Sequence, residues 1–501
     1  MAPFLRFTLA VCLIFCFFGD LAAIPWPLQR DSTTHLIGNS YGEYQRYGGS
    51  PYFHPGLDIL APAGTPVYAV KSGYVKAILT ISADLHWRVA IGDSSGAAEC
   101  DGWLYAHLSQ WTIPVIEGQW VNEGDYLGDL VVWPVSDFHH LHFVKIRHTG
   151  VVWDSNWEFL ANPLDELVGI TDPDTPVFEN AIGTQKFAFV ENETTSYFSE
   201  GSPVNGDVDI VCKAYDYINH YSWRLAPYQM EYRIEGDSSI PWTNSVCFTG
   251  LLDYANNVSS VYQTDGVCLT EGDYGSRNYY FNLTNTDGDS IIEASDQPYS
   301  WPTADFHNGQ YTIYVRAWDR AGNSSVESMS VNVANYFALT GNVTIGDGNP
   351  SLVGTEVSVL GGGPVDFTDE LGDFSLPLVG GGSQMITVSR AGYAAVDTIM
   401  LMNQDRSLNA ELIPGDYLAG DANYDDAVNV GDAVYVINYV FKGGYEPMPY
   451  AAGNVNGDEA VNVGDAVYLI NYIFKSGPPP MEGWTPRNPS SHDLATLNSK
   501  N

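Results

Sequence analysis

Basic residues are scarce in this chain of 501 residues, which has 21 Lys and Arg against 60 Asp and Glu. The formal net charge of −39 makes the surface repel phosphate, which excludes nucleic acids and anionic membranes as main partners. Charged residues are only 16% of the chain and aromatic residues 13%, which argues against disorder and against a coiled coil. The length predicts three or four domains, and the 49 glycines favour β-rich ones with tight turns.

Long apolar runs are also missing beyond the N-terminus. Residues 1–23 hold one basic residue, Arg6, then an apolar run over residues 7–18 and a small residue, Ala23. This pattern predicts a cleaved secretory signal peptide, and an uncleaved N-terminal anchor is the alternative. No later segment is apolar enough to span a membrane. We therefore expect a secreted protein outside the cell or at its surface, with the periplasm also open.

Cysteines are few, and only Cys100, Cys212, Cys247 and Cys268 follow the expected signal peptide. No two of them have the C-x-x-C spacing of a cysteine zinc site. Because an exported chain can form disulfides, we expect a Cys247–Cys268 bridge, which would close a short loop inside one domain. A Cys100–Cys212 bridge would cross a domain boundary, and free thiols are an equally open alternative there.

Turn-rich segments and changes in apolar spacing divide the rest of the chain into mostly β domains and one small helical module. Short alternating runs separated by Gly-containing turns fill residues 24–168, and a TDPDTP linker follows. Further short strands predict β-sandwiches over residues 177–335 and 336–413. Residues 414–480 contain an internal repeat with helical spacing, and residues 481–501 are expected to form a flexible tail.

The histidines of the first β-rich part form a pattern that suits a metal site. His54 and Asp58 are spaced H-x-x-x-D, His140 and His142 are spaced H-x-H, and His107 lies between the two pairs. Residues i and i+2 of a strand share a face, so His140 and His142 should point into one site. Hydrolytic zinc needs three protein ligands and an open position. His54, Asp58 and one histidine of the H-x-H pair can supply them, which leaves the other histidine and His107 for proton transfer.

Four stretches within residues 40–165 resemble lysostaphin/LytM-type zinc metalloendopeptidases: FHPGLDILAPAGTPVYAVKSGYV, LYAHLS, EGQWVNEGDYLGDL and HHLHF. The resemblance implies that His54, Asp58 and His142 bind one catalytic zinc ion. It implies catalytic roles for His107 and His140. It also implies the substrate, which is the peptide cross-links or bridges of bacterial peptidoglycan.

Bound zinc would polarise the scissile carbonyl and activate a water, and either His107 or His140 would take the proton of that water. The sequence leaves the division of these roles open. Where the family has a Thr-Gly-Pro-type turn before H-x-H, this chain has residues 133–139, WPVSDFH, which changes the expected groove rim. His139 should point to the opposite strand face and not bind metal. The alternatives are a non-catalytic cell-wall-binding or regulatory protein that retains the fold, and a structural surface protein.

The repeat consists of two acidic loops of twelve residues, each followed by an apolar helix pattern. Oxygen-bearing side chains fall at loop positions 1, 3, 5, 9 and 12, and position 7 can offer a backbone carbonyl, which suits calcium. The candidate calcium ligands of the first loop are Asp421, Asn423, Asp425, Ala427, Asn429 and Asp432. Those of the second loop are Asn454, Asn456, Asp458, Ala460, Asn462 and Asp465.

Two copies of loop and helix at an offset of 33 residues resemble a dockerin type I module. The resemblance implies two structural calcium ions and a cohesin-bearing scaffold protein as the partner. Position 6, usually glycine, is Asp426 in the first loop and Glu459 in the second. The second loop opens with Asn454 and not with aspartate, so we expect it to bind calcium more weakly. Residues 177–335 resemble bacterial Ig-like domains, and residues 336–413 resemble the carboxypeptidase regulatory-like sandwich. Spacer and wall-binding roles are both open for them.

Overall fold

A computed structural model describes residues 23–28, 35–47, 49–81, 84–154, 159–218, 223–249, 252, 258–273, 277–458 and 460–482. The expected signal peptide lies outside the described residues except for Ala23, and so does the tail beyond residue 482. No described helix combines the length and the apolar character that a membrane crossing requires. The fold is mostly β with a few helices near the C-terminal end, which confirms the predicted fold class.

The chain packs into two compact units. Among the described residues, the first contains residues 23–203, Asp207–Trp301 and Gln310–Val331, and the second contains Val204–Gly206, Pro302–Gly309 and residues 332–482. The histidine-rich part and the first sandwich therefore belong to one unit. The second sandwich and the helical module belong to the other.

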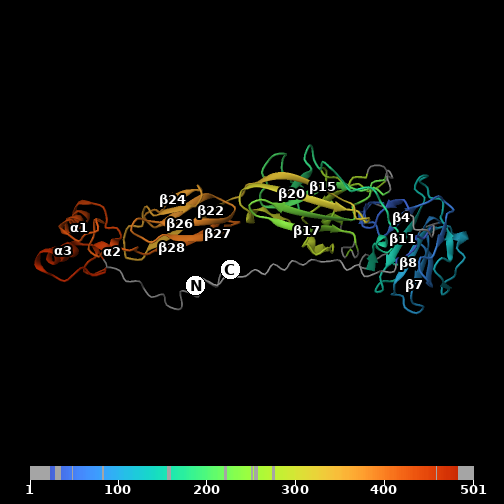
Figure 1. The fold of residues 1–501 in the computed structure, drawn as a ribbon, viewed down its shortest axis with the longest axis horizontal. Helices are drawn as coiled ribbons and strands as arrows, with labels where there is room; N and C mark the ends of the chain where they lie inside the picture. The colour runs from blue at the N-terminus through green and yellow to red at the C-terminus, as the bar shows by residue number, and fades with distance from the viewer. Residues whose placement is uncertain are drawn as a thin grey trace. The chain divides into compact units, whose positions relative to one another are not determined.

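An eight-stranded sheet carries the histidine pattern. Its strand order is β1 (Ile37–Asn39), β4 (Leu57–Leu60), β11 (His140–Ile146), β8 (Gly102–Leu108), β7 (Trp87–Gly92), β6 (Gly73–Thr80) and β9 (Trp120–Val121), with β12 (Leu160–Ala161) beside β11. Figure 1 shows β4, β11, β8 and β7 in neighbouring positions. Two strand pairs complete this part: β2 (Tyr44–Gln45) with β3 (Tyr52–Phe53), and β5 (Pro66–Tyr68) with β10 (Tyr126–Asp129).

The centre of this sheet is rigid because β8 and β11 are buried along almost their whole length. Trp103 of β8 stacks on Phe143 of β11 with the ring centroids 4.9 Å apart, and Tyr105 is fully buried beside them. Aromatic side chains of this size bury large apolar areas and dominate the packing of a core. The histidines of these two strands are therefore carried by backbone that packs firmly in the core.

The first sandwich consists of two sheets. One contains β13 (Val177–Glu179), β15 (Asp207–Tyr215), β14 (Phe187–Glu191), β18 (Tyr280–Asn282) and β19 (Trp301–Pro302). The other contains β17 (Ile240–Cys247), β16 (Gln229–Glu235), β20 (Gly309–Trp318) and β21 (Ser324–Val333). Strand β20 alternates buried and half-buried residues, as expected for a strand with one face in a core.

The expected Cys247–Cys268 bridge is wrong, because all four cysteines among the described residues are free. Cys247 ends β17, and its Sγ lies 2.9 Å from Thr249 Oγ1. Cys268 packs instead with Ala188 of β14 and Val211 of β15, in the opposite sheet. A short separation in sequence does not bring the two sulfurs together when each packs against a different sheet.

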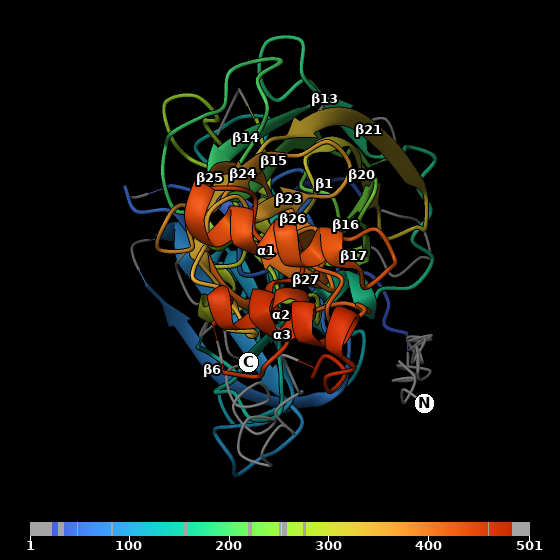
Figure 2. The same ribbon diagram turned by 90° about the vertical axis from the view of Figure 1, so that its left-hand side faces the viewer.

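The second unit contains another sandwich and the helical module. Its sheets are β25 (Asp373–Gly380), β22 (Tyr336–Ile345) and β28 (Arg406–Leu412), and β24 (Val365–Phe367), β23 (Glu356–Val359), β26 (Gly382–Ser389) and β27 (Val396–Met402). The helices are α1 (Val430–Lys442), α2 (Tyr450–Gly453) and α3 (Val463–Lys475). Figure 2 shows α1 and α3 side by side, and their apolar faces form one core.

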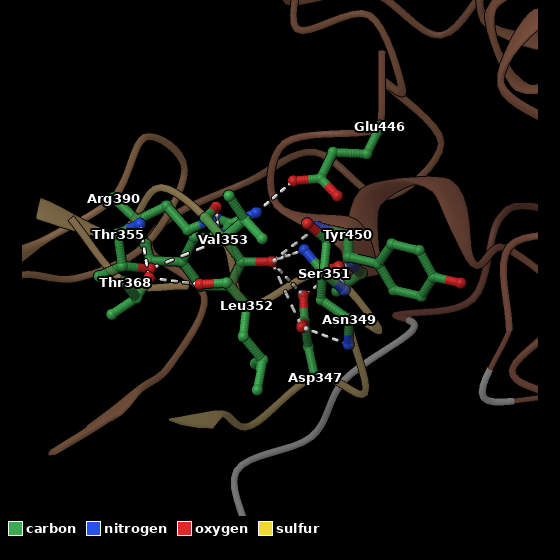
Figure 3. Close-up of polar contacts among 12 residues, drawn as sticks. Asp347, Asn349, Ser351, Leu352, Val353, Thr355, Thr368, Arg390, Glu446 and Tyr450 are labelled. Carbon is green, nitrogen blue, oxygen red and sulfur yellow. Dashed lines mark hydrogen bonds and ion pairs between the residues drawn. The ribbon is translucent and has the colours of Figure 1, made fainter. Parts of the chain in front are cut away.

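Polar contacts tie the helical module to its sandwich (Figure 3). Arg390 of the sandwich pairs with Glu446, which lies between the two loop-and-helix copies. Asp347 accepts a hydrogen bond from the Ala451 backbone N–H at 2.9 Å, and the Tyr393 hydroxyl accepts one from the Tyr450 N–H at 3.1 Å. The sandwich therefore holds the module by the short helix α2 and the segment before it.

Candidate metal centre and calcium loops

Three potential zinc ligands meet on neighbouring strands. His54 follows β3, Asp58 lies in β4, and His142 lies in β11 directly opposite Asp58. Asp58 Oδ1 is 3.2 Å from His54 Nε2 and 2.9 Å from His142 Nδ1, and these two nitrogens are 3.1 Å apart. Ligand atoms about 2.0–2.1 Å from a tetrahedral zinc ion lie about 3.3 Å from one another. The donor set and its spacing therefore fit one zinc ion.

Hydrogen bonds from the end of β1 and the residue after it orient two of these ligands. His54 Nδ1 lies 2.9 Å from the Ser40 carbonyl oxygen. Because a carbonyl can only accept, Nδ1 carries the proton and the Nε2 lone pair faces the metal position. Asn39 Nδ2 donates to Asp58 Oδ2 at 2.5 Å, which leaves Oδ1 for the metal. Supporting hydrogen bonds of this kind fix the orientation of metal ligands.

His140 and His107 lie beside the three ligands, each with one nitrogen committed to the backbone. His140 Nδ1 donates to the Phe138 carbonyl at 2.8 Å, and His107 Nδ1 donates to the Leu85 carbonyl at 2.9 Å. The two rings are 4.7 Å apart, and His140 Nε2 is 3.6 Å from Asp58 Oδ1. An imidazole bonded through Nδ1–H has its basic lone pair on Nε2, which is the atom that can accept a proton in each ring.

A β-bulge places His107. Trp87 of β7 pairs with Leu108 and Arg88 pairs with Ala106, so His107 has no partner on that strand. Its φ of 69° lies in the left-handed region, which costs a residue other than glycine of order 1–3 kcal/mol. Bulges occur next to active sites because they redirect a side chain out of the regular strand alternation.

Burial and mutual charge set the protonation of the centre. Burial alone would raise the pKa of Asp58, but the charges of His140 and His54 hold it well below its usual range. Burial lowers the pKa of His107 well below 6.5, and His140 and His142 lower it further. Burial also lowers the pKa of His142 to about 4, against the opposing pull of Asp58. An ionised aspartate and neutral imidazoles are the forms that bind zinc.

Further side chains complete the walls of the centre, and of these sequence reasoning missed His86. The Trp133 ring, from the segment expected to change the groove rim, lies 4.4 Å from the His107 ring and 4.9 Å from the His140 ring. His139 uses Nδ1 to accept a hydrogen bond from the Trp133 backbone N–H at 3.0 Å. His86 contributes a further ring 5.3 Å from His107. No sequence motif marks His86, because a 3-10 turn brings it to the site.

The two acidic loops close around their own backbone in equivalent ways. In the first, Asp421 accepts hydrogen bonds from the Asp425 and Asp426 N–H groups, and Asp432 accepts from Asn423 and Asn429. In the second, Asp465 accepts from the N–H groups of Val455, Asn456 and Asn462. Asn429 and Asn462 cap α1 and α3, each with a capping box completed by the aspartate three residues on. Among the described residues, some groups of three or more His, Cys, Asp or Glu have ligand atoms within 4.8 Å of one another. The carboxylates of the two acidic loops belong to none of these groups.

Loop position 6 explains one departure from the expected pattern. Asp426 has a φ of 65°, the left-handed conformation for which glycine is usually needed. Aspartate is among the few other residues that adopt this region with little penalty. The loop keeps its turn without glycine. Glu459, the equivalent residue, lies outside the described residues.

Two family models match parts of the chain. Residues 52–155 match Peptidase family M23, and residues 419–474 match the Dockerin type I domain. The chain is similar to the solved catalytic domain of lysostaphin from Staphylococcus simulans, at 24% identity over 26% of this chain and 90% of that one, with a TM-score of 0.21. It is similar to a mutant catalytic domain of the prophage-encoded M23 protein EnpA from Enterococcus faecalis, at 26% identity over 26% and 92%, with a TM-score of 0.21.

A third similar structure is a zinc-containing peptidase from Vibrio cholerae, at 23% identity over 25% of this chain and 36% of that one, with a TM-score of 0.21. No curated protein matches the chain. M23 peptidases depend on zinc and dockerins bind calcium, and both domain types are typical of extracellular or cell-surface proteins. The chain therefore contains a peptidase family M23 domain over residues 52–155 and a C-terminal dockerin type I domain over residues 419–474.

Proposed function

We propose that the protein is a secreted zinc endopeptidase that cleaves peptide cross-links or bridges of bacterial peptidoglycan, and that its dockerin attaches it to a cohesin-bearing scaffold. One observation carries the enzymatic part. His54, Asp58 and His142 offer three ligand atoms that lie 2.9 to 3.2 Å from one another. Two further histidines, whose Nδ1 atoms are bonded to backbone carbonyls, lie beside them. A wall-binding protein would have no use for this second pair.

The hydrogen bonds of the five residues indicate which of them would bind the metal and which would transfer protons. When bound, zinc would polarise the scissile carbonyl and lower the pKa of a water molecule to about 7. His54, Asp58 and His142 hold the metal. The Nε2 atom of His107 or His140 accepts the proton of the attacking water, and the imidazolium then stabilises negative charge on the carbonyl oxygen. The Trp133 ring packs against both histidine rings and helps to hold them in place.

The exposed faces of α1 and α3 support docking to a cohesin. Val434 and Phe441 of α1 are 49% and 66% exposed, and their equivalents Val467 and Phe474 of α3 are 51% and 66% exposed. Each pair is related by the repeat offset, so the two helices present matching apolar residues. The two candidate calcium ions, one in each loop, would fix the helices that carry them. The sandwich contacts leave these faces uncovered because they engage the segment around α2.

Isolated bacterial sacculi test the enzymatic proposal. The purified protein should release new peptide amine ends, detected by mass spectrometry, and a zinc chelator should abolish the release until zinc is restored. His107→Ala serves as the matched inactive protein, since it keeps the three metal ligands. Undiminished release by the chelated protein, or no release by the zinc-loaded one, would refute the proposal.

A further inference from the structure

Three buried or half-buried carboxylates form a second group in the first unit, distinct from His54, Asp58 and His142. Asp172 lies in the segment after the peptidase domain, Asp216 directly follows β15, and Asp319 directly follows β20. One oxygen of each lies within 4.8 Å of the other two. Asp216 and Asp319 are each only 6% exposed. The cluster lines a cavity together with Tyr217 and Ala321.

One oxygen in this cluster has nothing to bind. Asp216 Oδ1 is buried and has no hydrogen-bond partner among the described residues. Neither Asp216 nor Asp319 forms an ion pair in the part of the chain that the structure describes. The guanidinium of Arg320, next to Asp319 in sequence, reaches Asp165 instead, with Nε 3.2 Å from Oδ1. Buried charges in proteins are normally paired or bound to a metal.

We propose that Asp172, Asp216 and Asp319 form a calcium-binding site. All the donors are oxygens, and the group contains no histidine or cysteine, so zinc does not suit it. Calcium takes six to eight oxygen ligands in flexible geometry, which carboxylates binding through one or both oxygens, backbone carbonyls and water can provide. The ligands come from irregular segments at strand ends, which suits calcium better than the strict octahedron of magnesium.

The charges of the cluster support this assignment. Burial raises the pKa of Asp216 to about 8, and the neighbouring Asp319 and Asp172 carboxylates contribute to the rise. Without a cation, this carboxyl would have to keep a proton at neutral pH. A divalent cation removes both the repulsion and the unpaired oxygen.

The site would join three separate pieces of the unit. Strands β15 and β20 belong to the two different sheets of the first sandwich, and Asp172 belongs to the connecting segment. Asn323 already links the connecting segment to the end of β20, since its Nδ2 donates to the Asp172 carbonyl at 2.7 Å and to Asp319 Oδ2 at 2.6 Å. Calcium would fasten the connecting segment to both sheets, independently of the dockerin loops.

The test compares calcium stoichiometry in the full chain. The wild-type protein and Asp216→Asn are stripped with chelator and equilibrated with radioactive calcium chloride. The variant should bind one calcium fewer, whatever the dockerin loops bind. Asp209→Asn is the matched control, because Asp209 is also buried with an unpartnered Oδ1 but lies outside the cluster. It should bind as many calcium ions as the wild type.

A second measurement protects the test against a folding defect. Limited proteolysis should cut the connecting segment around Asp172 faster in the stripped wild-type protein than in the calcium-loaded one. If Asp216→Asn lacks a cooperative melt, the half-buried Asp172→Asn replaces it in both measurements. Equal calcium stoichiometry in wild type and a folded variant would overturn the proposal, and the cluster would then be a set of carboxyls that share protons.

Discussion

Arg277 of the first sandwich and Glu43 of the histidine-rich part form a buried ion pair, with Nη1 3.3 Å from Oε1 and side chains 2% and 0% exposed. The Tyr279 hydroxyl also donates to this carboxylate. The other oxygen of Glu43 accepts hydrogen bonds from Ser40 N at 2.6 Å and Ser40 Oγ at 3.1 Å. The Ser40 carbonyl in turn orients His54. The sandwich therefore supports the candidate metal centre through Glu43, which Arg277 contacts, and Ser40, which Glu43 contacts.

Replacing Arg277 by methionine should destabilise the first unit by about 3–5 kcal/mol, because it leaves the Glu43 carboxylate buried without an opposite charge. The double variant Arg277→Met/Glu43→Gln should recover part of this loss, since no uncompensated charge remains. Urea unfolding followed by near-UV circular dichroism measures both. Glu235→Gln, which breaks a partly exposed pair with Arg233 at its more exposed partner, is the control and should cost about 1 kcal/mol or less. A double variant no more stable than the single one would contradict this reading.

Asn39→Ala should weaken zinc binding without removing a ligand. The change deletes the hydrogen bond that holds Asp58 Oδ2, so the carboxylate can rotate away from the position that serves the metal. Losing a supporting contact of this kind typically costs about 10–100-fold in metal affinity. Competition with a chromophoric chelator measures the affinity directly. An unchanged dissociation constant would show that the strand register alone orients Asp58.

His107→Ala and His142→Ala should separate proton transfer from metal binding. The first variant keeps all three ligands, so we expect a full equivalent of zinc and a loss of about 10²–10⁴-fold in turnover on sacculi. The second lacks a ligand, so we expect loss of the metal itself. Zinc content by atomic absorption, set against peptide release, distinguishes them. Loss of zinc from His107→Ala would instead make His107 a ligand.

The sequence predicted the members of the centre but not its surroundings. H-x-H and H-x-x-x-D spacings are local, and the strand period of two places His140 and His142 on one face. The bulge that turns His107 inward depends on a register shift between β7 and β8, which no local pattern encodes. The support Asn39 ends β1, and the supports Ser40 and Glu43 come from the loop after it, where Glu43 pairs with Arg277 of the sandwich. Chain segments far apart in sequence decide such features.

The same distinction applies to the cysteines and to the middle of the chain. A loop of suitable length predicted a bridge between Cys247 and Cys268, but strand pairing sends the two thiols to different sheets. The alternating runs predicted two sandwiches, and sheets of this kind are present in both ranges. The sequence did not predict the contacts between the first sandwich and the peptidase domain, because no motif surrounds Arg277 and Tyr279, which make them. Tertiary contacts between domains leave little trace in a single sequence.

Calcium removal should unfold the dockerin and abolish docking to a cohesin. The loops hold carboxylates close to their own backbone, and the helices begin at capping residues that belong to these loops. Ligand binding to the folded form alone shifts the equilibrium toward it. Helical circular dichroism and cohesin binding by calorimetry should both be lost in chelator and return with calcium. Asp421→Ala should cause a larger loss of calcium affinity than Asn454→Ala, since it removes a charged ligand. Undiminished docking in chelator would refute the assignment of the loops.

Asp209 of β15 should make the first unit less stable as the pH rises. Burial, with the nearby charge of Glu193, raises the pKa of this carboxyl to about 7 from a usual value near 3.8. The folded form therefore binds the proton more tightly, so the stabilisation is complete below about pH 4 and is lost as the pH rises through 7. Asparagine does not titrate, so Asp209→Asn should remove up to about 4 kcal/mol of this dependence between pH 4 and 8. Urea unfolding across that range measures it, with the exposed Asp154→Asn as control. Parallel curves for wild type and Asp209→Asn would show that the carboxyl is hydrated in the folded protein.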